Sequence, residues 1–220
     1  TKMTKTNQHK VKDFLINNGV IIVMFILVIY TGFTSDNFFT KNNFMNILMN
    51  MSSRLVIALG IAGCVITAGC DLSAGRMIGF GACISGMLLQ RMDYSGKFFP
   101  DMQPLNVFVV ALIAMLVCAA FGTVTGFFIA YLNVPPFIAT LAMMEIVYGI
   151  GLIVTNATPL GGYVEQYTNV SNGKFLGINY LIWIAIIVAA ITWFIFNMTR
   201  HGKYMYAIGG NPQAAEVAGV

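Results

Sequence analysis

The sequence has few charged residues. Asp, Glu, Lys and Arg make up only 9% of its 220 residues, whereas about a quarter of an ordinary soluble domain is charged. Hydrophobic residues make up 58% of the chain, and this composition excludes a soluble globular enzyme. The formal net charge of +4 is spread too thinly to indicate a surface that binds nucleic acid.

The chain also lacks the usual motifs of nucleotide and hydrolytic sites. It contains no G-x-x-x-x-G-K-[ST] phosphate loop, no H-E-x-x-H and no G-x-S-x-G. We therefore expect no enzymatic activity, and an ATPase that drives this protein would be a separate subunit. The cysteines form no C-x-x-C pattern and lie in apolar stretches, so we predict neither a disulfide nor a metal site at Cys64, Cys70, Cys83 or Cys118.

Long uncharged runs are the main feature present. A bilayer core of about 30 Å requires about 20 helical residues, and the run 102–144 can hold two such helices. Pro135 and Pro136 divide it, because proline lacks an amide donor and disfavours helix at the preceding residue. The stretches 91–104 and 156–178 are predicted as connectors. We predict an all-α polytopic integral membrane protein with about six transmembrane helices, at 14–33, 54–70, 72–90, 105–131, 137–155 and 179–198.

The charges predict the orientation of these spans. Lysines crowd the tail at 1–13, which places the N-terminus in the cytoplasm by the positive-inside rule. Six crossings return 200–220 to the cytoplasm, with a transmembrane domain at 14–199 between the two cytoplasmic segments. With Arg76 counted inside, basic residues are more numerous inside than outside. Residues 43–53 have apolar side chains on one helical face and asparagines on the other, which predicts an interfacial helix.

The segment around Asp71 and Ser73 interrupts the apolar pattern, and two interpretations remain open. Asp71 can cap a helix that starts near Leu72 at the cytoplasmic boundary, which makes the third span long enough to cross. Alternatively, the break belongs to a broken helix, whose irregular backbone is tolerated only where protein buries it or where it lines a cavity. If 72–90 is re-entrant instead of crossing, the orientation of the later spans is reversed.

Two charged residues fall within or beside the predicted spans. Glu145 lies near the middle of the fifth span. A carboxylate at that depth is costly unless it is paired, protonated or hydrated, so Glu145 is a candidate functional residue. Arg54 is either its partner or a side chain that extends from the outer interface to water.

Small residues recur at helical spacing in two spans. Gly75 and Gly79 form one G-x-x-x-G pair, and Gly122 and Gly126 form another, which Ala130 extends. Such rows allow two helices to approach closely, so we predict that they pack against other helices and do not contact substrate.

The C-terminal stretch predicts a short, sharply bounded helix. Asn211 is a favoured N-cap, Pro212 suits the first helical position, and Gly219 can end the helix in the left-handed conformation. The helix either presents a small surface to another protein or is an ordinary connector. Small side chains that leave room for a close approach are found at Ala214, Ala215 and Ala218.

Four blocks of this sequence resemble the permease subunits of binding-protein-dependent ABC sugar importers of the ribose/galactose type. The resemblance is closest to the galactose/methylgalactoside branch, which shares the Asp-Leu-Ser-Ala-Gly-Arg form. It covers almost the whole chain in order, with the matching blocks at 53–60, 71–76, 130–138 and 207–220.

This resemblance implies a function and its partners. The chain would be a multi-pass permease of the bacterial cytoplasmic membrane that moves a galactose-, glucose- or methylgalactoside-like monosaccharide inward. A second permease copy, a periplasmic or lipid-anchored sugar-binding protein and a separate ATPase that holds ATP and magnesium would complete the importer. The cytoplasmic loop that docks on the ATPase would contain Gly209, Gly210, Asn211, Pro212, Ala214, Ala215 and Gly219.

Three departures from the family pattern stand out. Ala68-Gly69-Cys70 replaces the usual glycine run before Asp71, and Glu145 occupies a position that is otherwise apolar or small. The family also continues with further helices beyond Val220, so we expect this chain to be incomplete as a subunit.

The alternative function is a stand-alone channel or a proton-coupled secondary transporter in which Glu145 carries the proton. Asp71, Ser73, Arg54 and Glu145 are the predicted residues of the translocation pathway.

Overall fold

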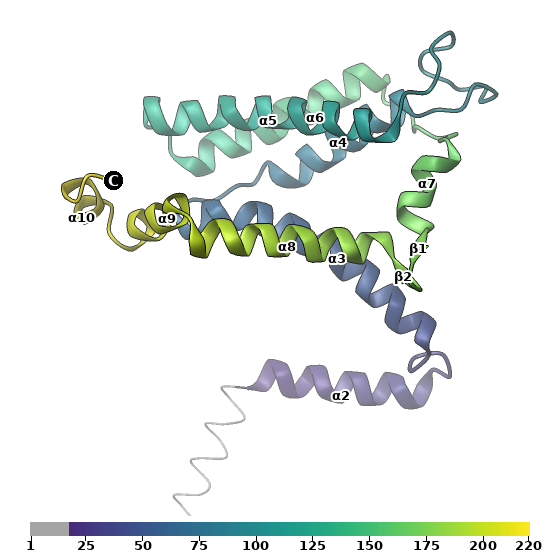
Figure 1. Cartoon of the computed structure of the whole chain (residues 1–220), viewed down its shortest axis with the longest axis horizontal. Helices are drawn as coiled ribbons and strands as arrows, with labels where there is room; N and C mark the ends of the chain where they lie inside the picture. The colour runs from purple at the N-terminus through teal and green to yellow at the C-terminus, as the bar shows by residue number, and fades with distance from the viewer. Residues whose placement is uncertain (1–17) are drawn as a thin grey trace, which may run out of the picture. The chain divides into compact units, whose positions relative to one another are not determined.

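The computed structural model describes residues 18–220, which are mostly helical (Figure 1). The predicted tail at 1–13 and the predicted start of the first span at residue 14 lie outside these residues. The chain divides into two compact units, residues 1–48 and 49–220. Four described helices are long and apolar enough to span a membrane, and two apolar helices are shorter.

The first unit contains α2 (Gly19–Thr34) and the beginning of α3 (Lys41–Ile66). α3 is a single helix of 26 residues, so the predicted interfacial helix at 43–53 is wrong as a separate element. It joins the predicted second span because this stretch has no proline and its first glycine is Gly60, so nothing interrupts the helix.

The second unit contains the remaining helices and a two-stranded hairpin. Its long helices match the predicted spans to within two residues, and the break falls at Pro135 and Pro136 as predicted. The elements are α4 (Ala74–Leu88), α5 (Val107–Leu132), α6 (Pro136–Thr155), α7 (Glu165–Asn172), β1 (Lys174–Phe175), β2 (Ile178–Asn179), α8 (Tyr180–Met198), α9 (Arg200–Gly210) and α10 (Pro212–Val217).

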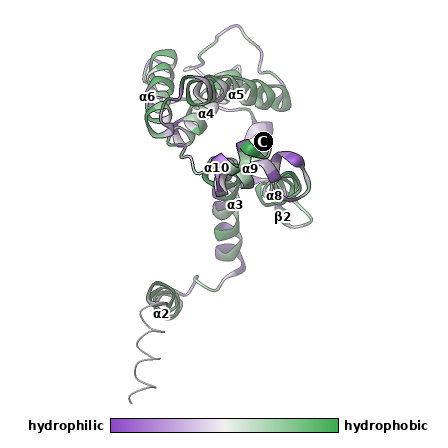
Figure 2. Cartoon of the chain, turned by 90° about the vertical axis from the view of Figure 1, so that its left-hand side faces the viewer, coloured by the Kyte–Doolittle hydropathy of each residue, from purple (hydrophilic) through white to green (hydrophobic). Residues whose placement is uncertain are grey.

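The core of this unit lies where α4 packs against α5 and α6. The rings of Phe80 and Phe121 meet edge to face, with centroids 5.5 Å apart. Figure 2 shows that α5 and α6 consist mainly of hydrophobic residues, as expected of helices in contact with lipid. The buried core side chains are Phe80, Ile84, Ala114, Met143 and Val147.

The helices of the second unit have two distinct loop-bearing ends. One end carries the loop after α4, together with α7 and the hairpin, and the other carries α9 and α10 (Figure 1). At the first end the amide of Val164 donates to the carbonyl of Leu89 at 2.8 Å, and the amide of Arg91 donates to that of Gly162 at 2.7 Å. α4 therefore ends at the side of the unit opposite α9 and α10.

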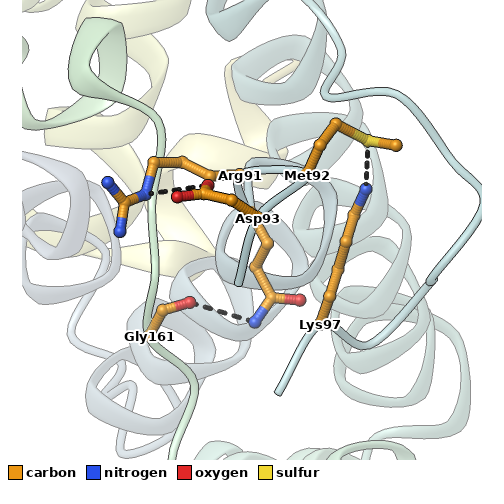
Figure 3. A network of polar contacts seen from close by, with 6 residues as sticks. Arg91, Met92, Asp93, Lys97 and Gly161 are labelled. Atoms are coloured by element: carbon orange, nitrogen blue, oxygen red, sulfur yellow. Dashed lines mark hydrogen bonds and ion pairs between the residues drawn. The ribbon is translucent and has the colours of Figure 1, made fainter. Parts of the chain in front are cut away.

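A buried glutamine organises this first end. Gln90 is only 1% exposed; its amide nitrogen donates to the carbonyl of Gly161 at 3.0 Å, and its side-chain oxygen accepts from the amide of Phe98 at 2.7 Å. Figure 3 shows the surrounding network, including the ion pair of Arg91 and Asp93 at 3.6 Å. The stretches 91–104 and 156–178, both predicted as connectors, are thus joined by hydrogen bonds through Gln90 and Arg91.

The predicted connector 156–178 contains α7, β1 and the first residue of β2. Burial raises the pKa of Tyr163 above its ordinary value, and nearby Tyr167, Cys83 and Tyr94 add to this effect. Further along, Asn179 accepts from the amide of Leu181 at 2.8 Å and so caps α8.

Gly162 provides the first testable prediction. Its φ is +69°, and an added Cβ would overlap the ring of Tyr94, coming within 2.7 Å of Cδ1. We expect Gly162→Ala to lower the thermal unfolding temperature of the detergent-purified protein, because the left-handed conformation alone costs about 1–2 kcal/mol for an L-residue. The matched control is Gly161→Ala, which has an ordinary φ and a contact of 3.3 Å. Equal unfolding temperatures for the two variants would contradict the prediction.

Candidate functional site

The chain between α3 and α4 is an irregular segment, 67–73. α3 ends after Ile66, where the amide of Gly69 donates to the carbonyl of Cys64 at 2.8 Å. Ala68, which lies between the end of α3 and Gly69, has φ of +58°, a left-handed conformation that favours glycine. The backbone at Ala68 is therefore strained.

Asp71 anchors the far end of the segment. Its Oδ1 accepts two hydrogen bonds, from the amide of Ser73 at 2.8 Å and from the Ser73 hydroxyl at 2.7 Å. α4 begins at Ala74 with Ser73 in the N-cap position, so the predicted start near Leu72 is wrong. At 15 residues, or about 22 Å, α4 is shorter than a full span.

The irregular segment lines a cavity of about 280 Å³ between α5 and α6. Gly122, on its wall, lies more than two helical turns before the end of α5 at Leu132, so the cavity reaches into the helical layer. This position favours the broken-helix interpretation over a simple cap at the boundary. The lining residues are Cys64, Thr67, Gly69, Cys70, Asp71, Ser73, Gly122, Thr125, Gly126, Ile129, Pro136 and Thr140.

Hydroxyl groups give the cavity its polar character. The Thr125 hydroxyl donates to the carbonyl of Phe121 at 3.0 Å, and the Thr140 hydroxyl donates to that of Pro136 at 2.8 Å. Since each hydroxyl uses its proton within its own helix, its oxygen remains a hydrogen-bond acceptor. The sequence analysis missed both threonines, although a threonine within an apolar span is a detectable signal.

A second cavity of about 200 Å³ lies between α4 and α6. The Arg76 guanidinium stands over the ring of Tyr148, 4.0 Å from its centroid, in a cation–π contact. Tyr148 is past the middle of α6, so Arg76 lies beside the body of this helix. The prediction that Arg76 belongs to the cytoplasmic charges is therefore not supported.

The glycine rows do not pack against other helices in the described residues. A Cβ added at Gly75, Gly79, Gly122 or Gly126 would meet nothing within 4 Å. Instead, the first pair lines the Arg76 cavity and the second pair lines the Asp71 cavity. The packing prediction therefore does not hold within residues 18–220, because helix spacing alone does not reveal which face has a neighbour.

The other two charged candidates lie elsewhere. Arg54 and Glu145 are both exposed, on α3 and α6, and neither is among the lining residues of the two cavities. Among residues 18–220 no ion pair joins them; the ion pair found there is that of Arg91 and Asp93. The structure thus brings together Asp71 and Ser73, but not all four predicted pathway residues.

The C-terminal helix has the predicted caps. The Asn211 side chain accepts from the amide of Ala214 at 3.1 Å, Pro212 occupies the first turn, and Gly219 has φ of +81°. Ala215, however, is only 6% exposed. Ala215 is therefore not part of the exposed surface of α10, which is in contact with α9. Its predicted role in docking on an ATPase stays a prediction.

The exposed part of α10 is formed by other residues. Val217 is 92% exposed, and Ala214, Glu216 and Ala218 are exposed as well. Gly209 and Gly210 end α9, and they differ in surroundings: a Cβ on Gly210 meets nothing, whereas one on Gly209 would overlap the carbonyl oxygen of Ile66.

The described residues show no arrangement suited to a metal ion. All four cysteines are free, and no three His, Cys, Asp or Glu side chains in residues 18–220 are grouped as ligands. The polar chemistry of the site therefore comes from one carboxylate and several hydroxyls.

Comparisons with known proteins place the chain among transport proteins. The family described as branched-chain amino acid transport system / permease component matches residues 43–220. The chain is 40% identical over 225 residues to the galactose/methyl galactoside import permease protein MglC of Escherichia coli (strain K12), covering 99% of this chain and 67% of that protein. It is 30% identical over 224 residues to the ribose import permease protein RbsC of the same strain, covering 100% and 66% respectively. No solved structure matches.

Proposed function

The chain belongs to the family of branched-chain amino acid transport system permease components, and on this basis we propose that it carries a monosaccharide across the bacterial cytoplasmic membrane in an ATP-driven importer. It spans about two thirds of the length of its sugar-permease relatives. We infer a galactose-, glucose- or methylgalactoside-like substrate, since the galactoside permease is the more similar of the two compared relatives.

The composition of the Asp71 cavity is the observation that carries the sugar assignment. Its polar side chains are one carboxylate, several hydroxyls and two thiols, and among residues 18–220 no Lys, Arg or His lines it. A sugar offers several hydroxyl donors to these acceptors. An amino acid, which the family description names, would bring a carboxylate that finds no cation among the lining residues. The cavity thus suits weak polar contact with a neutral polyol.

The geometry also supports a topology. α4 together with the irregular segment 67–73 connects the end of α3 to the end of the unit that carries α7 and the hairpin, which is consistent with this part of the chain crossing the membrane although α4 alone is short. With α2 this gives the proposed six crossings and a cytoplasmic N-terminus. α9 and α10 would then face the cytoplasm, where the exposed side of α10 docks on an ATPase that holds ATP and magnesium. A second permease copy and a periplasmic or lipid-anchored sugar-binding protein would complete the assembly.

Uptake in proteoliposomes tests this function. The complete subunit is reconstituted with its ATPase and binding protein, and uptake of labelled galactose is measured with and without ATP. We expect uptake that requires both ATP and the ATPase, and that unlabelled galactose but not leucine reduces. Competition by leucine alone would overturn the sugar assignment, and uptake by the permease alone would overturn the importer.

Glu145 separates the importer from the proton-coupled alternative. Because Glu145 is exposed and does not line the Asp71 cavity, we expect Glu145→Gln to retain the uptake rate to within about twofold, the spread typical of a surface change. The same liposomes are assayed with an imposed proton gradient and no ATP. Loss of gradient-driven uptake in Glu145→Gln would favour the secondary transporter instead.

A further inference from the structure

α9 and the part of α3 that belongs to the second unit, residues 49–66, meet through glycines. An added Cβ at Gly209 of α9 would overlap the carbonyl oxygen of Ile66 in α3 and lie 2.9 Å from its carbonyl carbon and 3.5 Å from Cα of Thr67. Four residues earlier in α9, the methyl group of Met205 lies 3.0 Å from where a Cβ would stand on Gly63 of α3. The spacing of these pairs places them on one face of each helix.

At Gly209 the contact is between backbones, with no side chain in between. A contact made by flexible side chains can absorb a displacement through rotamer changes, whereas two closely packed main chains cannot. A movement of α9 toward or along α3 must therefore shift the last turn of α3.

The contact lies between two functional elements. On one side, Asn211 follows α9 directly and starts α10, whose exposed face is the proposed docking surface. On the other side, Thr67 follows Ile66 directly, and both Thr67 and Asp71 line the cavity. Ala68, between them, has the left-handed φ of +58°, so the segment that would receive a displacement already contains a strained residue.

We propose that Gly209 is a positioning residue that transmits the movement of α10 to the wall of the Asp71 cavity through the backbone of Ile66 and Thr67. This inference rests on the proposed docking of α10 on an ATPase. Nucleotide-driven movement of α10 carries α9 with it, the α9 backbone displaces the end of α3, and the irregular segment changes the position of Asp71. The two positions of that segment are the states whose populations the nucleotide shifts.

Gly209→Ala tests the relay, with Gly210→Ala as its matched control. Both glycines end the same helix and neither has a positive φ, but a Cβ at position 210 meets nothing within 4 Å. In the complete importer we expect Gly209→Ala to bind the ATPase and hydrolyse ATP normally while uptake falls by about tenfold or more, a loss in the range of ordinary coupling energies. Gly210→Ala should transport normally. Equal uptake in the two variants, or loss of ATPase binding in Gly209→Ala, would overturn the relay.

A second readout follows the cavity wall itself. Cys70 lines the cavity, so a variant in which alanine replaces Cys64, Cys83 and Cys118 reports on it through the rate of Cys70 modification by a thiol reagent. We expect ATP to change this rate in the otherwise unaltered protein and in Gly210→Ala, but not in Gly209→Ala. A purely structural role of Gly209 would leave the nucleotide effect intact and would overturn the proposal.

Cross-linking keeps the proposal testable if Gly209→Ala does not fold. With the native cysteines replaced, Gly63→Cys and Met205→Cys are joined by a short thiol cross-linker. If α3 and α9 move as one body, the cross-linked importer should retain uptake; loss of uptake on cross-linking would show that they slide and would overturn the relay. Failure of the proposed function is recognised separately, because the unaltered subunit would then not bind an ATPase at all.

Discussion

Asp71→Ala is expected to lower sugar uptake by about 10- to 100-fold, the cost of losing hydrogen bonds to a charged acceptor. Asp71 supplies the one carboxylate that lines the cavity, and its Oδ1 holds both the amide and the hydroxyl of Ser73. Its removal leaves the amide and hydroxyl of Ser73, which precedes α4, without this acceptor and the cavity without its strongest acceptor. Uptake by the reconstituted importer measures the effect, and the unfolding temperature measures the accompanying loss of the hydrogen bonds to Ser73.

Two further variants separate the effect of the hydrogen bonds to Ser73 from the effect of the carboxylate charge. Asp71→Asn keeps a side-chain oxygen that can accept from Ser73, so we expect near-normal unfolding with reduced uptake. Asp93→Ala removes an exposed carboxylate at the opposite end of the unit and should leave uptake unchanged. If Asp71→Asn and Asp71→Ala both transport normally, the cavity does not belong to the pathway.

Val217→Asp is expected to abolish binding of the ATPase. Val217 is 92% exposed, and it is apolar, as expected of a residue that a partner covers. A carboxylate buried there without a partner costs several kcal/mol, so the amount of co-purified ATPase should fall by about 100-fold or more. Gentle detergent extraction followed by quantification of both subunits measures this effect.

The matched control is Leu176→Asp, which makes a similar change on the hairpin at the other end of the unit. Leu176 is 78% exposed, and its left-handed φ of +53° is one that aspartate tolerates. It should bind the ATPase normally. A bulky substitution at Ala215 is a poorer test, because this side chain is buried within the chain and the change would disturb α10 itself. Normal ATPase binding by Val217→Asp would refute the docking surface.

Much of the helical structure could be predicted from the sequence, because its causes are local. α5 ends at Leu132 and α6 begins at Pro136 because of the two prolines. Both caps of α10, at Asn211 and Gly219, follow from side-chain and backbone preferences. The family resemblance depended on similarly local blocks, and the comparisons confirm it.

Length predictions were less successful where no local signal marks an end. α3 runs through the predicted boundary between an interfacial helix and a span, since apolar periodicity changes there without any helix-breaking residue. α4 begins two residues later than predicted, because Ser73 occupies the N-cap position and the Asp71 carboxylate accepts from the amide and hydroxyl of Ser73. Both errors concern boundaries that depend on competing hydrogen bonds.

By itself, the sequence determined that this is a helical membrane protein, because composition, uncharged runs and turn residues act over short stretches of chain. Its membership of a permease family came from the resemblance of four local blocks. Only the tertiary structure decided which faces have neighbours. In the folded chain Gly122 and Gly126 line a cavity, and Ala215 is buried. Gly209 lies against Ile66, which is more than a hundred residues away in the sequence. Glycine and alanine carry no side-chain signal for such a choice, so contact between distant helices depends on how the whole set of helices packs.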